Sequence, residues 1–148
     1  MAEQGRIHQM AVRVYYEDTD SGGIVYYANY LRYAERARTE LLRSLGVESS
    51  NLMNDDGIAL AVRRCLVDYI KPAVLDDALV VETEIKKIGG ASLEARQTVL
   101  RDGEMLVSMD IKLGCLELSS GRPKGMPGKV RAKLLEYFEN AENQMKKA

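Results

Sequence analysis

The sequence predicts an α+β fold in which one antiparallel sheet of about five strands wraps its apolar face around a single long helix. Two periodic patterns support this prediction. Apolar side chains recur with the period of a helix over residues 29–45, whereas residues 58–117 have the β-rich and alternating character of successive strands. No other predicted element could cover the apolar face of the sheet, so we expect the helix of residues 29–45 to lie against it.

The first third of the chain predicts a strand, a loop and this helix. The strand covers residues 6–16, with Val12, Val14 and Tyr16 on one side, and runs into an acidic loop. The helix follows from Asn29 to Leu45, because its apolar residues share one face and Gly46 is a stop signal. That face carries Tyr30, Ala34, Ala37, Leu41 and Leu45. A short polar segment follows at residues 51–56.

The remainder predicts four strands in a meander and a last helix. Strands are expected over residues 58–70 and 79–88, followed by a turn at Gly89-Gly90. The next strand places Leu93, Ala95, Gln97 and Val99 on one face. The Asp-Gly pair within residues 101–104 supplies the positive φ of a tight hairpin. A long strand then alternates through Met105, Val107, Met109, Ile111, Leu113 and Cys115.

Pro127 is expected to open the final helix, which is amphipathic. Its apolar residues are Val130, Leu134, Phe138, Ala141 and Met145. We expect one domain over residues 1–148, with a core of about residues 6–127 and a C-terminal helix and tail over 128–148.

Composition narrows the classes of partner. The formal net charge is −1, with 21 basic and 22 acidic residues interspersed, which disfavours nucleic acid. No apolar stretch reaches the length of a membrane span and the N-terminus lacks a signal-like apolar core, so we expect a cytoplasmic protein without membrane insertion. Cys65 and Cys115 are expected to be reduced core residues.

Residues 18–30 carry the chemistry of the chain: Asp18-Thr19-Asp20-Ser21-Gly22-Gly23-Ile24-Val25-Tyr26-Tyr27-Ala28-Asn29-Tyr30. A carboxylate just ahead of a helix start, where unpaired N–H groups can polarise an oxygen, suits attack on an acyl group. The alternative is that both aspartates only form turns or caps. A calcium loop is disfavoured because Gly22 stands where such a loop needs an oxygen-bearing side chain, and Asn29 stands where it needs glutamate. His8 is the only histidine, so a histidine-centred triad lacks partners.

The same stretch resembles the hotdog-fold acyl-CoA thioesterases, specifically the branch associated with the Tol-Pal system. The resemblance lies in residues 12–20, the Gly22-Gly23 pair and residues 35–42, and it extends from about Met10 to about Pro127. More distantly, the chain is similar to 4-hydroxybenzoyl-CoA thioesterase. The resemblance implies a hotdog fold with the helix of residues 29–45 at its centre, no cofactor or metal, and a homodimer or homotetramer with active sites between subunits.

The resemblance also implies site residues. Asp20 matches the essential carboxylate, and the backbone N–H of Tyr27 matches the oxyanion donor, at a position where many Tol-Pal-branch relatives carry histidine. The implied substrate contacts are Gly23, Ile24, Val25, Tyr26 and Ser92. The flanking tyrosines favour catalysis for Asp20 and a turn or capping role for Asp18. Whether Asp20 attacks the thioester or activates a water is open at this level.

The expected function is therefore acyl-CoA thioester hydrolysis. The coenzyme A site is less clear, because the segment before Ser92 has none of the basic residues that the hydroxybenzoyl branch uses for phosphates. Lys86, Lys87, Arg122 and Lys124 are candidates by charge alone. The alternative function is binding of acyl carrier protein or envelope machinery, with weak hydrolysis. A dehydratase of the same fold would need a histidine-centred site, which this sequence does not supply.

Overall fold

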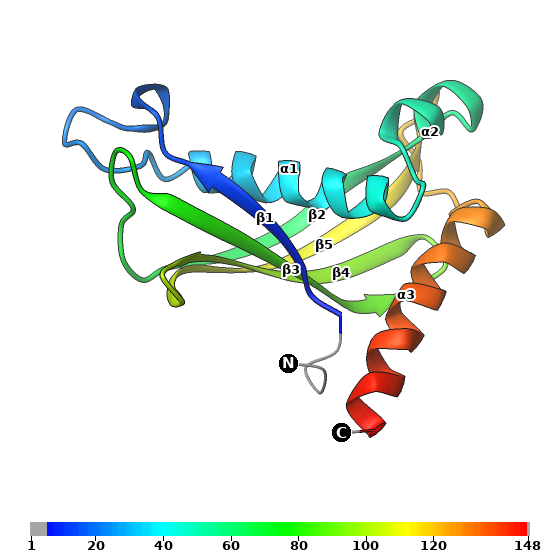
Figure 1. Ribbon diagram of the computed structural model, residues 1–148. Coiled ribbons are helices and arrows are strands. Elements are labelled where there is room, and N and C mark those ends of the chain that lie inside the picture. The colour runs from blue at the N-terminus through cyan, green and yellow to red at the C-terminus, as the bar shows by residue number, and fades with distance from the viewer. Residues whose placement is uncertain (1–5, 148) are drawn as a thin grey trace.

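The computed structural model describes residues 6–147, and the side chains of residues 6–139. Figure 1 shows the sheet curving around one long helix, with a second long helix at one end of the sheet. The elements in chain order are β1 (His8–Arg13), a 3-10 turn (Tyr16–Asp18), α1 (Asn29–Ser44), α2 (Ser49–Asp55), β2 (Ile58–Tyr69), β3 (Ala78–Ile88), β4 (Ser92–Arg101), β5 (Glu104–Glu117) and α3 (Gly128–Lys147). The predicted α+β class and antiparallel sheet are confirmed.

The strand order differs from the predicted meander. The five strands run in the order β1-β3-β4-β5-β2, and every neighbouring pair is antiparallel. The expectation holds for β3, β4 and β5, but it is wrong for β2, which pairs with β5 at the far edge. Tight hairpins use two to five residues. Residues 70–77 are longer and contain Pro72, so they cross the end of the sheet instead of turning back.

The two predicted hairpin turns are confirmed. Asp102 and Gly103 have φ values of 51° and 80°, the left-handed geometry that the Asp-Gly pair predicted. At the other turn, the Gly89 N–H donates to the Ser92 carbonyl at 2.8 Å. Both turns therefore place successive strands side by side.

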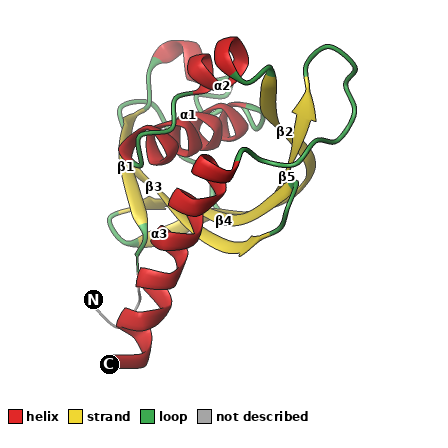
Figure 2. Cartoon of the chain, turned by 90° about the vertical axis from the view of Figure 1, so that its right-hand side faces the viewer, coloured by secondary structure: helices red, strands yellow, loops and turns green. Residues whose placement is uncertain are grey.

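Helix α1 covers one face of the sheet, as Figures 1 and 2 show. Its predicted apolar face is confirmed, since Tyr30, Ala34, Ala37 and Leu41 are all buried, while Leu45 is partly buried. Small side chains at the centre of this face let the helix approach the strands closely. Tyr33 is buried as well, with 0% exposed.

A buried glutamine joins α1 to the sheet. Gln97 on β4 is 0% exposed and lies on the same inner face as Leu93, Ala95 and Val99, as predicted. Its Nε2 donates to the Ala34 carbonyl and to Thr83 Oγ1, both at 2.9 Å. Its Oε1 accepts from Arg38 Nη1 at 3.0 Å. Because buried polar groups are costly unless bonded, this network favours one position of the helix over the sheet.

Two local predictions are wrong, and one helix was not predicted. The polar segment around residues 51–56 lies mostly in this helix, α2, which docks through Leu52, 4% exposed. The first strand ends at Arg13, and Tyr16 lies in the 3-10 turn with 81% of its surface exposed. Met105 is 42% exposed, while Leu106 is buried, because the register of β4 and β5 shifts between Val99 and Leu100.

Helix α3 begins directly after Pro127, as predicted, and lies beside the β3–β4 hairpin. Val130 and Leu134 are buried and Phe138 is partly buried, whereas the side chains of Ala141 and Met145 lie outside the described residues. Both cysteines are free. Within residues 6–147, no helix has the length and apolar character needed to cross a membrane.

Two buried tyrosines on α1 differ in the hydrogen bonding of their hydroxyl groups. The Tyr30 hydroxyl accepts the Ala73 N–H at 3.0 Å, whereas the Tyr33 hydroxyl has no hydrogen-bond partner among the described residues. Tyr30→Phe leaves a buried N–H unpaired, so we expect it to lower the free energy of unfolding by about 1–2 kcal/mol. Tyr33→Phe is the matched control, with a smaller expected loss. Urea denaturation of both variants measures this, and a larger loss for Tyr33→Phe would contradict the assignment.

Candidate active site

The acidic loop before α1 is a narrow hairpin. Thr19 and Val25 form an antiparallel bridge, and the Asp20 N–H donates to the Ile24 carbonyl at 2.9 Å. The Gly23 N–H donates to the Asp20 carbonyl at 3.0 Å. Gly23 has a φ of 81°, which a residue with a side chain rarely adopts. The loop thereby holds Asp20 at the start of its turn.

The Asp20 side chain is exposed on this hairpin. Its Oδ1 accepts the Gly22 N–H at 2.8 Å, and among the described residues its second carboxylate oxygen has no hydrogen-bond partner. A Cβ at Gly22 would lie 3.2 Å from Oδ1, so glycine at this position gives the carboxylate room. One oxygen is thus held while the other is available to a ligand.

Asp18 has the opposite environment. It is 7% exposed, and its carboxylate accepts the Tyr15 N–H at 2.9 Å and the Asn29 side-chain amide at 2.7 Å. Its backbone carbonyl accepts the Tyr26 N–H at 2.8 Å. Because Asn29 is the first residue of α1, Asp18 ties both ends of the loop to the start of the helix. These contacts support the turn role expected for Asp18, and its bond to the Tyr15 N–H caps the 3-10 turn and not α1.

The backbone N–H of Tyr27 is left free at the helix start. The Tyr26 N–H is used by Asp18, and the Asn29 N–H donates to the Tyr26 carbonyl at 2.8 Å. Between them, the Tyr27 N–H has no acceptor within residues 6–147, and no side chain caps α1. A helix start carries partial positive charge, so this N–H can polarise the oxygen of a bound carbonyl group.

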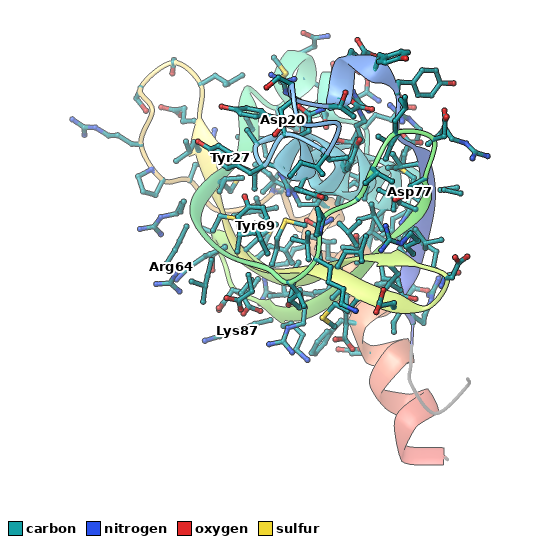
Figure 3. The ribbon with its side chains drawn as sticks, turned by 90° about the vertical axis from the view of Figure 1, so that its left-hand side faces the viewer. Asp20, Tyr27, Arg64, Tyr69, Asp77 and Lys87 are labelled. Atoms are coloured by element: carbon teal, nitrogen blue, oxygen red, sulfur yellow. The ribbon has the colours of Figure 1, made fainter. Side chains whose placement is uncertain are left out.

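Tyr69 joins the site from β2, and the sequence reasoning missed it. Its hydroxyl donates to the Tyr27 carbonyl at 3.2 Å, and its ring lies 6.2 Å from the Tyr27 ring and 5.7 Å from the Tyr30 ring. The Tyr26 and Tyr27 rings are tilted by 54° to each other, with their centroids 4.9 Å apart. Figure 3 shows Asp20, Tyr27 and Tyr69 at the same end of the molecule. The available signal was that Tyr69 ends a β-rich run just before Pro72.

The predicted substrate contacts are not all brought together in one chain. Gly23, Ile24 and Tyr26 are exposed in or beside the loop, but Val25 is 3% exposed and packs in the core. Ser92 begins β4 and pairs with Gly114, at the opposite end of β3 from the loop. Of the basic candidates for the coenzyme A phosphates, Lys86 and Lys124 form ion pairs with Glu84 and Glu117.

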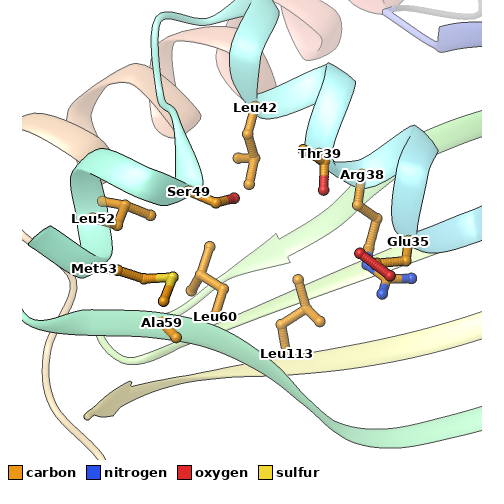
Figure 4. Close-up of a pocket in the computed structure, with 10 residues that line it drawn as sticks. All are labelled: Glu35, Arg38, Thr39, Leu42, Ser49, Leu52, Met53, Ala59, Leu60 and Leu113. Atoms are coloured by element: carbon orange, nitrogen blue, oxygen red, sulfur yellow. The ribbon is translucent and has the colours of Figure 1, made fainter.

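A cavity of about 220 Å³ lies at the other end of α1, between this helix, α2 and β2. Its wall is mostly apolar, and Figure 4 shows Arg38 and Glu35 at one side of it and Met53 and Leu52 at the other. No cluster of three or more potential metal-ligating His, Cys, Asp or Glu side chains occurs in the described part of the chain.

Because the two aspartates have different surroundings, we expect their replacement to lower the free energy of unfolding by different amounts. Asp18→Ala removes the acceptor of the buried Asn29 amide and of the partly buried Tyr15 N–H, so we expect it to lower the free energy of unfolding by about 2–4 kcal/mol. Asp20→Ala removes an exposed side chain and should cost less than about 1 kcal/mol. Chemical denaturation followed by circular dichroism compares the two, and equal losses would contradict the structural role of Asp18.

Comparison with known proteins identifies the family. The sequence matches the thioesterase superfamily over residues 22–108. An acyl-CoA thioesterase YbgC from Haemophilus influenzae is 43% identical over 121 residues, covering 82% of this chain and 89% of that protein. The acyl-CoA thioester hydrolase YbgC of Escherichia coli is 39% identical over 122 residues, covering 82% and 90%.

Solved structures agree with the sequence comparison. A probable thioesterase from Bartonella henselae matches with a TM-score of 0.79 at 32% identity, over 82% of this chain and 100% of that one. The sheet of five antiparallel strands around α1 is the hotdog fold that the family resemblance implied. The chain therefore belongs to the thioesterase superfamily.

Proposed function

We propose that this protein hydrolyses acyl-CoA thioesters, with Asp20 as the catalytic carboxylate and the Tyr27 N–H as the oxyanion donor. The observation that carries the proposal concerns one loop and the helix start that follows it. Among the described residues, the loop presents an exposed carboxylate with one oxygen unpartnered, and the helix start presents an N–H without an acceptor. The YbgC relatives bear names of acyl-CoA hydrolases, which supports the substrate class.

The chemistry requires only these two groups. The thioester oxygen accepts the Tyr27 N–H, which stabilises the negative charge that develops on it. The leaving group is a thiolate, whose parent thiol has a pKa of about 8.5, so departure needs no strong general acid. A metal or organic cofactor is therefore not required by the reaction.

Asp20 can act in two ways. In direct attack, a carboxylate oxygen bonds to the acyl carbon, the carbon–sulfur bond breaks, and water hydrolyses the resulting anhydride. In general-base catalysis, Asp20 takes a proton from the water that attacks the acyl carbon. An exposed carboxylate is a weak base at neutral pH and favours the first route, whereas desolvation by a second subunit would favour the other.

We further propose that two copies pair through the outer edge of β2. This edge strand is 12 residues long, whereas β1 at the other edge has 6. Val62 is 50% exposed and Leu66 is 62% exposed on it, and no described segment pairs with its outer side. Long apolar edges of this kind are covered in native proteins, because their free N–H and C=O groups attract another strand.

Two-fold pairing would complete the site. Identical strands related by a two-fold axis across the sheet run antiparallel, so the Tyr69 end of one β2 lies beside the Ile58 end of the other. The Asp20 loop sits at the Tyr69 end, because Tyr69 contacts Tyr27. The loop of each subunit would then face the start of the partner's β2, and substrate would bind between subunits.

The same pairing would bring the hairpin before Ser92 close to the proposed substrate site of the partner subunit. The loop of residues 118–127 adjoins the start of β2, since the Leu118 N–H donates to the Gly57 carbonyl at 2.9 Å. It also adjoins the hairpin before Ser92, where the Met126 N–H donates to the Gly90 carbonyl at 2.9 Å. Arg122 and Lys124 lie in this loop, so these basic side chains could meet the coenzyme A phosphates of a substrate held by the partner's Asp20.

The catalytic assignment predicts the effect of one isosteric change. Asp20→Asn keeps the size of the side chain but removes its charge, so we expect kcat for acyl-CoA hydrolysis to fall by about 1,000-fold or more. Thiol release from a panel of acyl-CoAs measures this. Asp102→Asn, in the exposed β4–β5 turn, is the matched control and should retain full activity.

Equal activity of Asp20→Asn and the unaltered protein would contradict the role of Asp20. If the protein acts mainly as a binding partner of acyl carrier protein, hydrolysis should be weak in the unaltered protein and in Asp20→Asn alike. Both proteins should then retain acyl carrier protein in a pull-down.

The proposed interface predicts a change in assembly. Leu66→Glu places a charge on the exposed β2 edge, so we expect the dimer to dissociate at micromolar concentration and the activity to fall with it. Met105→Glu is the control, because Met105 is an exposed apolar residue at the β4–β5 turn. Multi-angle light scattering reports the mass, and a Leu66→Glu variant that remains a fully active dimer would refute this interface.

A further inference from the structure

The cavity between α1, α2 and β2 contains a feature that the proposed catalytic residues leave unexplained. Its wall is built mainly by leucines, Met53 and Ala59, yet Arg38 also lines it. Figure 4 shows the Arg38 side chain extending from α1 beside this cavity, on the side away from Leu52 and Met53. A half-buried guanidinium at an apolar wall is costly unless its N–H groups are hydrogen-bonded.

Arg38 has few partners for its charge. One N–H donates to Gln97 Oε1 at 3.0 Å, a neutral acceptor that is itself held by Thr83 and Ala34. Within the described side chains, no carboxylate forms an ion pair with Arg38. Glu35, one turn earlier on α1, also lines the cavity but lies beyond ion-pair distance. Burial lowers the pKa of the Arg38 guanidinium, and the nearby negative charge of Glu35 offsets part of this effect.

The position of the cavity links it to the catalytic loop. It is lined by Ala59 and Leu60, at the start of β2. In the two-fold pairing proposed above, this end of the strand lies beside the partner's Tyr69, and therefore beside the loop that carries the partner's Asp20. Met53 at the cavity is 50% exposed in the single chain.

The size and chemistry of the cavity indicate what it can hold. A volume of about 220 Å³ is smaller than most ligand pockets, so it suits a short acyl chain and not a long one. The apolar wall suits methylene groups, and a guanidinium with free donors suits a carboxylate, which it can bind by two parallel hydrogen bonds.

We propose that this cavity receives the acyl group of the substrate and that Arg38 selects short acyl groups ending in a carboxylate, the coenzyme A monothioesters of short dicarboxylic acids. The inference rests on the proposed function, because the thioester itself must reach the partner's Asp20. Arg38 is a specificity residue in this account, and it takes no part in bond breaking.

The test compares two substrates of equal chain length, adipoyl-CoA and hexanoyl-CoA, which differ only in the terminal carboxylate. We expect the unaltered protein to have the higher kcat/KM for adipoyl-CoA. Arg38→Met should lower kcat/KM for adipoyl-CoA by about 10- to 100-fold while changing that for hexanoyl-CoA by less than about threefold. Arg36→Met, an exposed arginine on the same helix, is the matched control and should change neither.

A second variant keeps the test decisive if Arg38→Met fails to fold. Glu35→Gln alters an exposed carboxylate beside the cavity, which should repel the substrate carboxylate, so this variant should raise the preference for adipoyl-CoA. The proposal is overturned if hexanoyl-CoA is the better substrate, if Arg38→Met lowers both rates equally, or if that variant does not fold and Glu35→Gln leaves the preference unchanged. Absence of Asp20-dependent hydrolysis of either ester would instead reject the proposed function.

Discussion

The buried carboxylate of Asp18 is the contact on which the rest of the site depends. It accepts the Tyr15 N–H on one side of the loop and the Asn29 side-chain amide at the first residue of α1. Helix α1 is in turn bonded to the sheet, through the Ala34 carbonyl and Gln97 on β4. A continuous series of hydrogen bonds therefore runs from the core of the sheet to the loop that carries Asp20. The Tyr27 N–H, which has no acceptor among the described residues, lies where this loop meets α1.

The two aspartates of the loop show how environment separates structural from chemical roles. Asp18 is buried and its two carboxylate oxygens are both used by the protein. Asp20, two residues later, is exposed and offers one oxygen without a partner among the described residues. A buried charge is stable only when it is well bonded, whereas a reactive charge must keep a position open for the substrate. The hairpin provides both conditions within a few residues.

Much of this fold could be predicted because its signals are local. The helical spacing of Tyr30, Ala34, Ala37 and Leu41 and the Asp-Gly turn at Asp102 depend only on neighbouring residues. The position of β2 beside β5 could not be predicted in the same way, because residues 70–77 carry no signal of the edge to which they lead. The family resemblance, and not periodicity, singled out Asp20, and local patterns alone would have left both aspartates as turn residues.

The parts of the site that the sequence missed depend on contacts between distant segments. Tyr69 meets Tyr27 only because β2 ends beside the start of α1, and Arg38 lines a cavity only because α2 docks over β2. A sequence pattern within one strand or helix contains no information about contacts between distant segments. A second subunit was implied by the family resemblance, and its pairing along the exposed edge of β2 is our proposal.

The most direct measurement is a crystal structure of the protein with a non-hydrolysable acyl-CoA analogue that keeps the carbonyl group but replaces the thioester sulfur with a methylene. Our account predicts that the carbonyl oxygen accepts the Tyr27 N–H, with an Asp20 oxygen on the open face of the carbonyl carbon and a second subunit closing the site along β2. A carbonyl bound away from the start of α1, with Asp20 still in solvent, would contradict it.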